Sequence, residues 1–270
     1  MLIYPLHADS LEKRQLTLPN ERRVIGLNIS ALTDIGRVRK INEDSYKYFI
    51  SDKYSYAIVA DGMGGHLAGE VASKMAVDII GEYIENNLSD ELDRFQVKEV
   101  IRKAFLKANS DIYNYSCDNE FVMGMGTTAT LCMIYENYII YAHVGDSRAY
   151  KASNTITQIT RDHSYVQELV KLGQITPEEA KHHPRRNYIT RAMGVEDTVK
   201  VDTGTQKYNS ERILICSDGL YGEIDDDELF ELLSTPNIEQ GVKALVNLAN
   251  ERGGADNITA VIMEGEKADE

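Results

Sequence analysis

Residues 54–66 read Tyr-Ser-Tyr-Ala-Ile-Val-Ala-Asp-Gly-Met-Gly-Gly-His, and the order of these residues predicts how one strand of the fold ends. Residues 54–60 form an apolar run of strand length, and the next two residues, Asp61 and Gly62, are typical of turns. Gly62 has no Cβ, so a metal ion could approach its backbone carbonyl closely. We expect a buried strand over 54–60 that presents Asp61 at its end.

The same arrangement of an apolar run followed by an aspartate and a glycine or serine occurs three times, at Asp61, Asp146 and Asp218. A fourth aspartate, Asp256, precedes the last predicted strand. A single aspartate of this kind is most often a turn residue, but the recurrence favours a shared site. If the four carboxylates meet, divalent cations must offset their repulsion, and oxygen ligands favour Mg²⁺ or Mn²⁺ over zinc.

A second acidic pair and a nearby arginine fit the same site. Glu43 and Asp44 open another predicted strand, and Arg39 comes four residues before Glu43. An arginine in a basic segment is more often a surface charge, but a guanidinium can also hold phosphate oxygens in a two-point fork. Beside this acidic set, Arg39 makes phosphoryl chemistry the leading hypothesis.

The remaining pattern predicts an α+β fold, because strands and helices come in blocks rather than in alternation. Residues 1–23 are an extension without a clear period, and we expect one domain over 24–270 that carries an inserted segment over about 162–194. The expected strands are 25–32, 44–50, 54–60, 127–135, 138–144, 148–152, 155–160, 199–206, 212–216 and 258–263, and the expected helices are 68–88, 97–115, 165–172, 225–233 and 238–250, with a short one capped by Thr176.

Composition narrows the class of protein. The chain has 270 residues, and 43 acidic against 29 basic residues give a formal charge of −14, which disfavours nucleic acid as a partner. No apolar run approaches the roughly 20 residues that span a bilayer, and the N-terminus does not resemble an export signal. The three cysteines, Cys117, Cys132 and Cys216, include no C-x-x-C pair and suit free thiols. We expect a cytoplasmic protein that does not cross a membrane.

In this order the residues resemble the type 2C metal-dependent protein serine/threonine phosphatases (the PPM family), and their bacterial branch most closely. The resemblance covers residues 24 to about 264. The motifs that carry it are Thr33-Asp34-Ile35-Gly36 with Arg39, Asn42-Glu43-Asp44-Ser45, Ala60-Asp61-Gly62-Met63-Gly64-Gly65-His66, Gly124-Met125-Gly126-Thr127-Thr128, Gly145-Asp146-Ser147-Arg148, Cys216-Ser217-Asp218-Gly219-Leu220 and Gly254-Ala255-Asp256-Asn257. The resemblance implies a four-layer α-β-β-α sandwich with two central antiparallel sheets, in which residues 162–194 form a flap beside the active site.

The resemblance also implies a role for each matching residue. It assigns two Mn²⁺ or Mg²⁺ ions to the site, with a third in many bacterial members. Asp61 would bridge the first two ions, and Asp218 and Asp256 would complete the first site. The Gly62 carbonyl and a water held by Glu43 would serve the second ion, and Asp146 and Asp218 would hold the third. Arg39 would bind the substrate phosphate, and Asp44 and Asn257 would support these ligands.

The implied reaction is hydrolysis of phosphoserine and phosphothreonine in proteins by direct attack of a metal-bridging hydroxide, without a phosphoenzyme. The leaving alkoxide needs a proton. Eukaryotic members carry a histidine directly after the Asp-Gly pair, where this chain has Met63. A metal-bound water is therefore the first choice of donor, and His66 is the second. A bacterial serine/threonine kinase would be the opposing partner of an enzyme that we expect to be monomeric.

The same residues disfavour several other functions. The sequence has no P-loop, no dinucleotide fingerprint and no arginine six positions after a cysteine. A phosphoprotein-binding module without catalysis and a metal-dependent nuclease stay open as alternatives. His182 and His183 are expected to be surface residues rather than zinc ligands, residues 225–228 are expected to cap a helix, and Arg185 and Arg186 are either surface charges or contacts for acidic substrates.

Overall fold

The structure of the chain is a computed structural model that describes residues 27–64, 68–89 and 91–265. The N-terminal extension 1–23 and the second proton-donor candidate, His66, lie outside these ranges. Within them no helix is long and apolar enough to cross a lipid bilayer.

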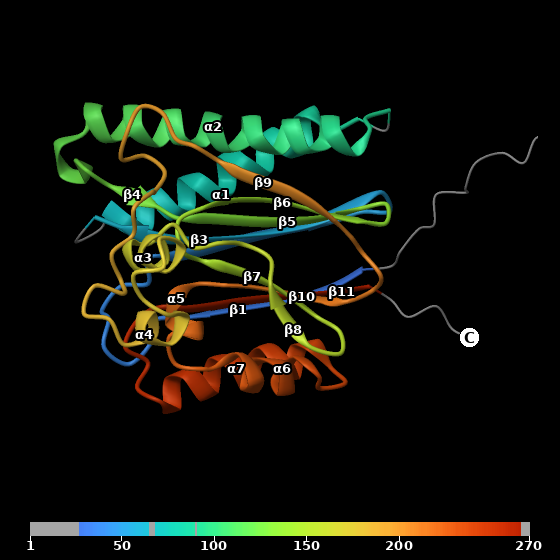
Figure 1. Cartoon of the computed structure of the whole chain (residues 1–270). Helices are drawn as coiled ribbons and strands as arrows, with labels where there is room; N and C mark the ends of the chain where they lie inside the picture. The colour runs from blue at the N-terminus through green and yellow to red at the C-terminus, as the bar shows by residue number, and fades with distance from the viewer. Residues whose placement is uncertain (1–26, 65–67, 90, 266–270) are drawn as a thin grey trace, which may run out of the picture.

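Two antiparallel sheets form the centre of the molecule (Figure 1). The first sheet has the order β2-β3-β5-β6-β9, with strands β2 (Asp44–Ile50), β3 (Tyr54–Met63), β5 (Ala129–Tyr135), β6 (Tyr138–Val144) and β9 (Asp202–Lys207), and the short β4 (Gly126–Thr127) pairs with the end of β3. The second sheet has the order β1-β11-β10-β7-β8, with strands β1 (Leu27–Asp34), β11 (Ile258–Gly265), β10 (Arg212–Cys216), β7 (Arg148–Ala152) and β8 (Ile156–Gln158).

Helices cover the outer face of each sheet, which confirms the predicted four layers. The pair α1 (Ala68–Asn87) and α2 (Arg94–Asp118) lies on the first sheet, and the pair α6 (Asp226–Leu233) and α7 (Ile238–Glu251) lies on the second (Figure 1). Three apolar cores follow from this arrangement, one under each helix pair and one between the sheets.

The alternation of side chains along β3 decides where Asp61 points. Tyr56, Ile58 and Ala60 pack in the core under α1 and α2, whereas Ala57 and Val59 pack in the core between the sheets. Because successive side chains of a strand point to opposite faces, Asp61 falls on the inner face, toward the second sheet. The residues before Asp61 are buried on both faces, which explains why the run 54–60 is almost continuously apolar.

Several predicted boundaries were wrong, and tertiary pairing explains most of the differences. β3 does not end before Asp61 but continues to Met63, because its last residues pair with β4. The predicted strand 127–135 is broken at Thr128 into β4 and β5. The predicted strand 155–160 is shortened to 156–158, and the predicted strand 199–206 is observed at 202–207.

Helical segments differ from the predictions mainly at their ends. α2 begins earlier than expected, after Asp93, which caps it in a capping box with Gln96. A short helix that the sequence did not predict, α5 (Asp218–Tyr221), follows β10. Residues 162–194, which we call the flap segment, carry α3 (Tyr165–Lys171) and α4 (Pro177–Lys181), the latter capped by Thr176 as expected. α3, α4 and α5 lie at the same end of the sandwich (Figure 1).

Candidate metal and phosphate site

Asp61 and Asp44 are direct cross-strand partners in β3 and β2, so their side chains share the inner face of the first sheet. The backbone of Asp61 is held on its other side by the end of β4 and the residue that follows it. Its N–H donates to Thr128 Oγ1 at 2.9 Å, and its carbonyl accepts from Thr127 Oγ1 at 2.9 Å and from Thr128 N–H at 2.8 Å. Three polar contacts therefore fix Asp61, although it lies near the end of a strand.

The other three predicted aspartates come from the second sheet and its connections. Asp218 is the first residue of α5, directly after β10, and Asp256 lies two residues before β11. Asp146 lies in the connection between β6 and β7 and is almost fully buried, with 7% of its surface exposed. The structure thus brings together aspartates that are far apart in the sequence.

The electrostatics of Asp61 show that these carboxylates interact. Burial raises the pKa of Asp61 well above its ordinary value, and the neighbouring charges of Asp44, Asp218, Asp146 and Asp256 raise it further. The protein around this carboxyl withdraws most of its hydration, although Asp61 keeps some solvent contact. A group of carboxylates with these shifts is stable only when it is protonated or when positive charge is added.

Two further members of the cluster are shifted for the same reasons. Burial raises the pKa of Asp44 to about 7, against the hydrogen bond that Ser217 donates to it. Burial and the charge of Asp256 raise the pKa of Asp218 to about 6, although Arg39 acts in the opposite direction. Burial also raises the pKa of Asp146 well above its ordinary value, with Asp218 as the next cause. The cluster therefore holds protons near neutral pH unless cations replace them.

Unpaired oxygens provide a direct test of whether the residues suit metal ions. Glu43 Oε1, Asp44 Oδ1 and Asp218 Oδ1 are buried and have no hydrogen-bond partner. Buried carboxylate oxygens without a partner are costly, and a hard cation is a ligand that would satisfy them. Over the described ranges, no group of three or more acidic, histidine or cysteine side chains is arranged so that it could hold one metal ion by itself. Mg²⁺ fits such a site, because it keeps several waters and uses only one or two carboxylates.

Arg39 lies beside the cluster on the loop between β1 and β2. Its Nη2 donates to Asp256 Oδ2 at 2.6 Å, and its side chain is 47% exposed. Asn257 organises this loop, since its Nδ2 donates to the carbonyls of Ile35 at 2.9 Å and Ile41 at 3.0 Å, and its Oδ1 accepts from the Glu43 N–H at 2.9 Å. Asn257, the residue before β11, therefore anchors the loop that carries Arg39.

Gly62 and Glu43 are adjacent, and packing alone explains the glycine. The Gly62 N–H donates to the Glu43 carbonyl at 3.1 Å. A Cβ on Gly62 would lie 2.0 Å from the carbonyl oxygen of Gly69 in α1, which no side chain could tolerate. The close approach of α1 requires a glycine here, independently of any approach by a metal ion. The side chain of Glu43 lies against Gly69, and burial raises the pKa of its carboxyl.

Residues of the quoted motifs to which the sequence analysis gave no role support the cluster. Ser217 Oγ donates to Asp44 Oδ2 at 2.6 Å and accepts from the Thr259 N–H at 3.0 Å. Thr128 Oγ1 lies 2.7 Å from Ser147 Oγ, next to Asp146. Ser217 and Ser147 could have been found from their position, because each is next to an aspartate at the end of a strand, whereas Thr128 has no aspartate beside it.

Residues that were set aside have structural roles. Asp225 caps α6 in a capping box with Glu228, as expected, and Glu228 pairs with Arg252. His182 is exposed and His183 is half-buried. The Arg185 guanidinium lies over the rings of Tyr165 at 5.5 Å and Tyr188 at 6.0 Å in the flap segment. None of these residues lies in the carboxylate cluster.

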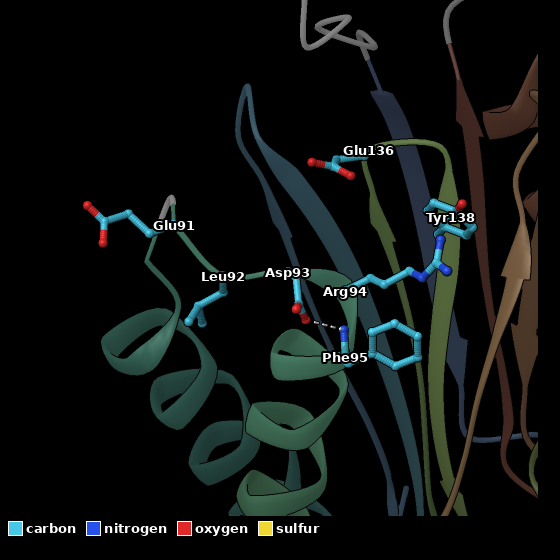
Figure 2. A pocket seen from close by; sticks show the side chains of 7 residues that line it. All are labelled: Glu91, Leu92, Asp93, Arg94, Phe95, Glu136 and Tyr138. Carbon is cyan, nitrogen blue, oxygen red and sulfur yellow. Dashed lines mark hydrogen bonds between the residues drawn. The ribbon is translucent and has the colours of Figure 1, made fainter. Parts of the chain in front are cut away.

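A hollow of about 390 Å³ lies elsewhere on the molecule, and Figure 2 shows the seven residues that line it. It includes Glu136 and Tyr138 of the hairpin between β5 and β6 and Arg94 at the start of α2, whose guanidinium lies 4.4 Å from the Tyr138 ring centroid. Tyr135 pairs with Tyr54, so this hairpin lies at the opposite end of β3 from Asp61. The hollow contains none of the predicted site residues.

A carboxylate cluster suited to hard cations next to an exposed arginine is the arrangement typical of metal-dependent phosphatases. Comparison with known proteins agrees, since the sequence model of the protein phosphatase 2C family matches residues 37–260 of this chain. The chain belongs to the protein phosphatase 2C family. Cys132 and Cys216, which a cysteine-dependent phosphatase would need to expose, are both buried.

Individual relatives show how similar the chain is to members of the family. The serine/threonine phosphatase stp of Listeria monocytogenes is 39% identical over 236 residues, which cover 86% of this chain and 93% of that protein. The crystal structure of Stp1 from Staphylococcus aureus has a TM-score of 0.83 and 36% identity, and covers 90% of this chain and 96% of that chain. The catalytic domain of the phosphatase PstP, solved in complex with two manganese ions, has a TM-score of 0.78 and 33% identity over 90% of this chain and 99% of that chain.

Proposed function

We propose that this chain is a Mn²⁺- or Mg²⁺-dependent phosphatase that hydrolyses phosphoserine and phosphothreonine in proteins. The observation that supports the proposal best is the cluster of Asp61, Asp44, Asp218 and Asp146, whose pKa values are raised by burial and by one another. Such a cluster destabilises the fold unless cations occupy it, so selection for function is its simplest explanation.

In this proposal Asp61 is the central ligand, because the charges of four other aspartates act on it. Asp218 and Asp256 would help to hold one cation, the Gly62 carbonyl and a water held by Glu43 would hold a second, and Asp146 with Asp218 would hold a third. When bound, such cations supply a water of lowered pKa and offset the charge on the phosphoryl oxygens. Ser217 keeps Asp44 in place, and Asn257 keeps the loop of Arg39 in place.

Arg39 is the proposed phosphate-binding residue. Its guanidinium is exposed and lies at the edge of the cluster, where a phosphate ester could enter from solvent. The fork of the guanidinium can donate two parallel hydrogen bonds to phosphoryl oxygens and so orient the ester. Met63 has no proton to give to the leaving alkoxide, so we assign proton donation to water, with His66 as the alternative donor.

We extend the proposal to the partner that makes the substrate. Hydrolysis of phosphoserine and phosphothreonine consumes the product of a serine/threonine kinase, so such a kinase must act upstream of this enzyme. In the flap segment, Arg185 lies over Tyr165 and Tyr188, and its positive charge suits acidic residues of a phosphoprotein. A monomer in the cytoplasm remains the working hypothesis for the assembly and its location.

Phosphate release from a phosphothreonine peptide tests the proposal. With Mn²⁺ the protein should release phosphate, and a chelator should stop the release. Asp61→Asn should abolish it, whereas the matched control Asp227→Asn, an exposed aspartate at the start of α6, should retain full activity. A binding module would retain the peptide without releasing phosphate at any metal concentration, and a nuclease would cleave DNA or RNA instead. Either result would replace the proposal.

A further inference from the structure

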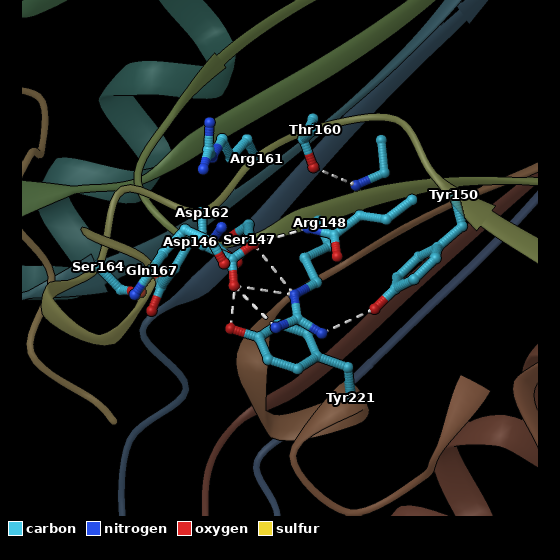
Figure 3. Close-up of polar contacts among 12 residues, drawn as sticks. Asp146, Ser147, Arg148, Tyr150, Thr160, Arg161, Asp162, Ser164, Gln167 and Tyr221 are labelled. Carbon is cyan, nitrogen blue, oxygen red and sulfur yellow. Dashed lines mark hydrogen bonds and ion pairs between the residues drawn. The ribbon is translucent and has the colours of Figure 1, made fainter. Parts of the chain in front are cut away.

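Arg148, on β7 two residues after Asp146, is the centre of a polar network (Figure 3). Its Nη2 donates to Asp162 Oδ2 at 2.7 Å, its Nε donates to both oxygens of Asp162 at 3.1 Å, and its Nη1 donates to Tyr150 Oη at 3.0 Å. Asp162 is only 9% exposed and also accepts from Gln158 Nε2 at 2.7 Å. An ion pair that is mostly buried and joined by several hydrogen bonds in this way has one well-defined geometry.

Tyr221 connects this ion pair to the carboxylate cluster. Its ring centroid lies 3.6 Å from Cζ of Arg148, so the guanidinium stacks on the ring. The Tyr221 hydroxyl donates to the backbone carbonyl of Asp146 at 3.1 Å. Tyr221 is also the last residue of α5, the helix that Asp218 begins. One side chain therefore contacts Arg148 and the backbone of Asp146 from the same helical turn that carries Asp218.

Three segments meet in the network. The first is the connection that carries Asp146, the second is α5, and the third is the flap segment, whose first residue is Asp162. The pairing of β7 with β10 fixes the connection of Asp146 relative to α5, since Arg148 is the cross-strand partner of Cys216, which lies two residues before Asp218. The ion pair of Arg148 with Asp162 then fixes the beginning of the flap segment against both.

We propose that Arg148, Tyr221 and Asp162 form a clamp that positions Asp146 against Asp218 and ties this pair of carboxylates to the flap segment. The inference rests on the proposed function, in which both aspartates bind cations. Because Tyr221 holds the Asp146 carbonyl, the backbone of Asp146 cannot rotate freely. The direction in which the Asp146 side chain leaves the backbone is therefore fixed. A ligand aligned in advance loses less conformational freedom when a cation binds. Arg148, Tyr221 and Asp162 are positioning residues, because they act through Asp146.

Two tyrosine hydroxyls in the network provide a matched test. Tyr221→Phe removes the contact to the Asp146 carbonyl, whereas Tyr150→Phe removes a contact to Arg148 that does not reach Asp146. Mn²⁺ binding is measured by titration calorimetry on the full chain, together with kcat and KM for a phosphothreonine peptide. Tyr221→Phe should weaken the weakest Mn²⁺ site by about 10-fold, as loss of a supporting hydrogen bond does at other metal sites, and leave KM unchanged. Tyr150→Phe should leave the Mn²⁺ isotherm unchanged.

Equal isotherms for the two variants would overturn the clamp, because a purely structural network would not distinguish the hydroxyls. Asp146→Asn separates the clamp from the function on which it rests. If Asp146→Asn leaves Mn²⁺ binding unchanged, both the ligand role and the clamp are wrong; if it weakens binding and Tyr221→Phe does not, only the clamp is wrong. Should Tyr221→Phe not fold, Asp162→Asn, which keeps the shape of the side chain, is expected to give the same 10-fold weakening, and an unchanged isotherm for it would overturn the clamp.

Discussion

Arg39, on the loop after β1, forms an ion pair with Asp256, on the loop before β11, and Nη2 of the arginine lies 2.6 Å from Oδ2 of the aspartate. One partner is the proposed phosphate ligand and the other is a proposed cation ligand. A cation at Asp256 and the Arg39 guanidinium compete for the same carboxylate, so cation binding would leave Arg39 available to phosphate. The side chains are 47% and 33% exposed, so solvent screens their pairing and its contribution is small.

Arg39→Ala should therefore have two effects of opposite sign. Activity, measured as kcat/KM for a phosphothreonine peptide, should fall by about 100-fold, because a donor to the phosphoryl oxygens is lost. Mn²⁺ binding, measured by calorimetry, should tighten by about two- to fivefold, because Asp256 loses its competing partner. The control Arg37→Ala removes the same charge from the same loop and should change neither quantity. Weaker Mn²⁺ binding in Arg39→Ala would contradict the competition.

Asp61→Asn should abolish activity and yet stabilise the metal-free protein. Four neighbouring aspartates raise the pKa of Asp61, so its negative charge opposes folding when no cation is present. Removing that charge should raise the melting temperature of the chelated protein by about 3 °C, the change expected for about 1 kcal/mol in a chain of this size. An unchanged or lower melting temperature would show that the cluster is not under electrostatic strain. Asp227→Asn is the control.

The stability of the metal-free protein should rise as the pH falls from about 8 to about 6.5. The pKa of Asp44 is raised to about 7 in the folded state, above its value in the unfolded chain, so the folded state binds the extra proton in this window. The gain is on the order of 1 kcal/mol. Below this window, His143 acts in the opposite direction, since burial lowers its pKa to about 3 and unfolding then takes up a proton. Melting curves in chelator should show this slope, Asp44→Asn should reduce it, and Mn²⁺, which replaces the protons of the whole cluster, should flatten it. A slope that persists in Asp44→Asn would assign the effect to another group.

Asn257→Ala should reduce both stability and activity. The side chain makes three hydrogen bonds, to the carbonyls of Ile35 and Ile41 and to the N–H of Glu43. At about 1 kcal/mol for each, the loss is about 3 kcal/mol, measured by denaturant unfolding. The loop that carries Arg39 then loses its anchor, so KM for the peptide should rise. Asn257→Asp loses both donors, sets a carboxylate oxygen against two carbonyls and adds a negative charge to the cluster, so it should cost at least as much stability as Asn257→Ala. A variant that loses stability at unchanged KM would separate Asn257 from the placement of Arg39.

Much of the architecture could be predicted because burial leaves a period in the sequence. The alternation along β3 and the helical spacing in α1 and α2 reflect which side chains face a core, so the elements themselves were predicted correctly. Their ends depend on distant partners. Asp61 has the local signal of a turn, but pairing with Asp44 and the contacts from Thr127 and Thr128 keep it in the strand.

The charged residues of the site could be predicted from the sequence, but the residues that hold them in place could not. A recurring aspartate after an apolar run is visible in the sequence, and a divalent-cation hypothesis follows from it. The hydrogen bond from Ser217 to Asp44 joins residues 173 positions apart, so no local pattern reports it. The same holds for the stacking of Arg148 on Tyr221, and α5 is too short for its periodicity to be seen.

Anomalous diffraction from crystals grown with Mn²⁺ tests the central claim most directly, because it locates the ions without any assumption about activity. Manganese peaks are expected at about 2.1 Å from carboxylate oxygens of Asp61 and Asp218, the distance typical of small divalent cations. Manganese found only at exposed acidic residues such as those at the start of α6, with none near Asp61, would contradict the account.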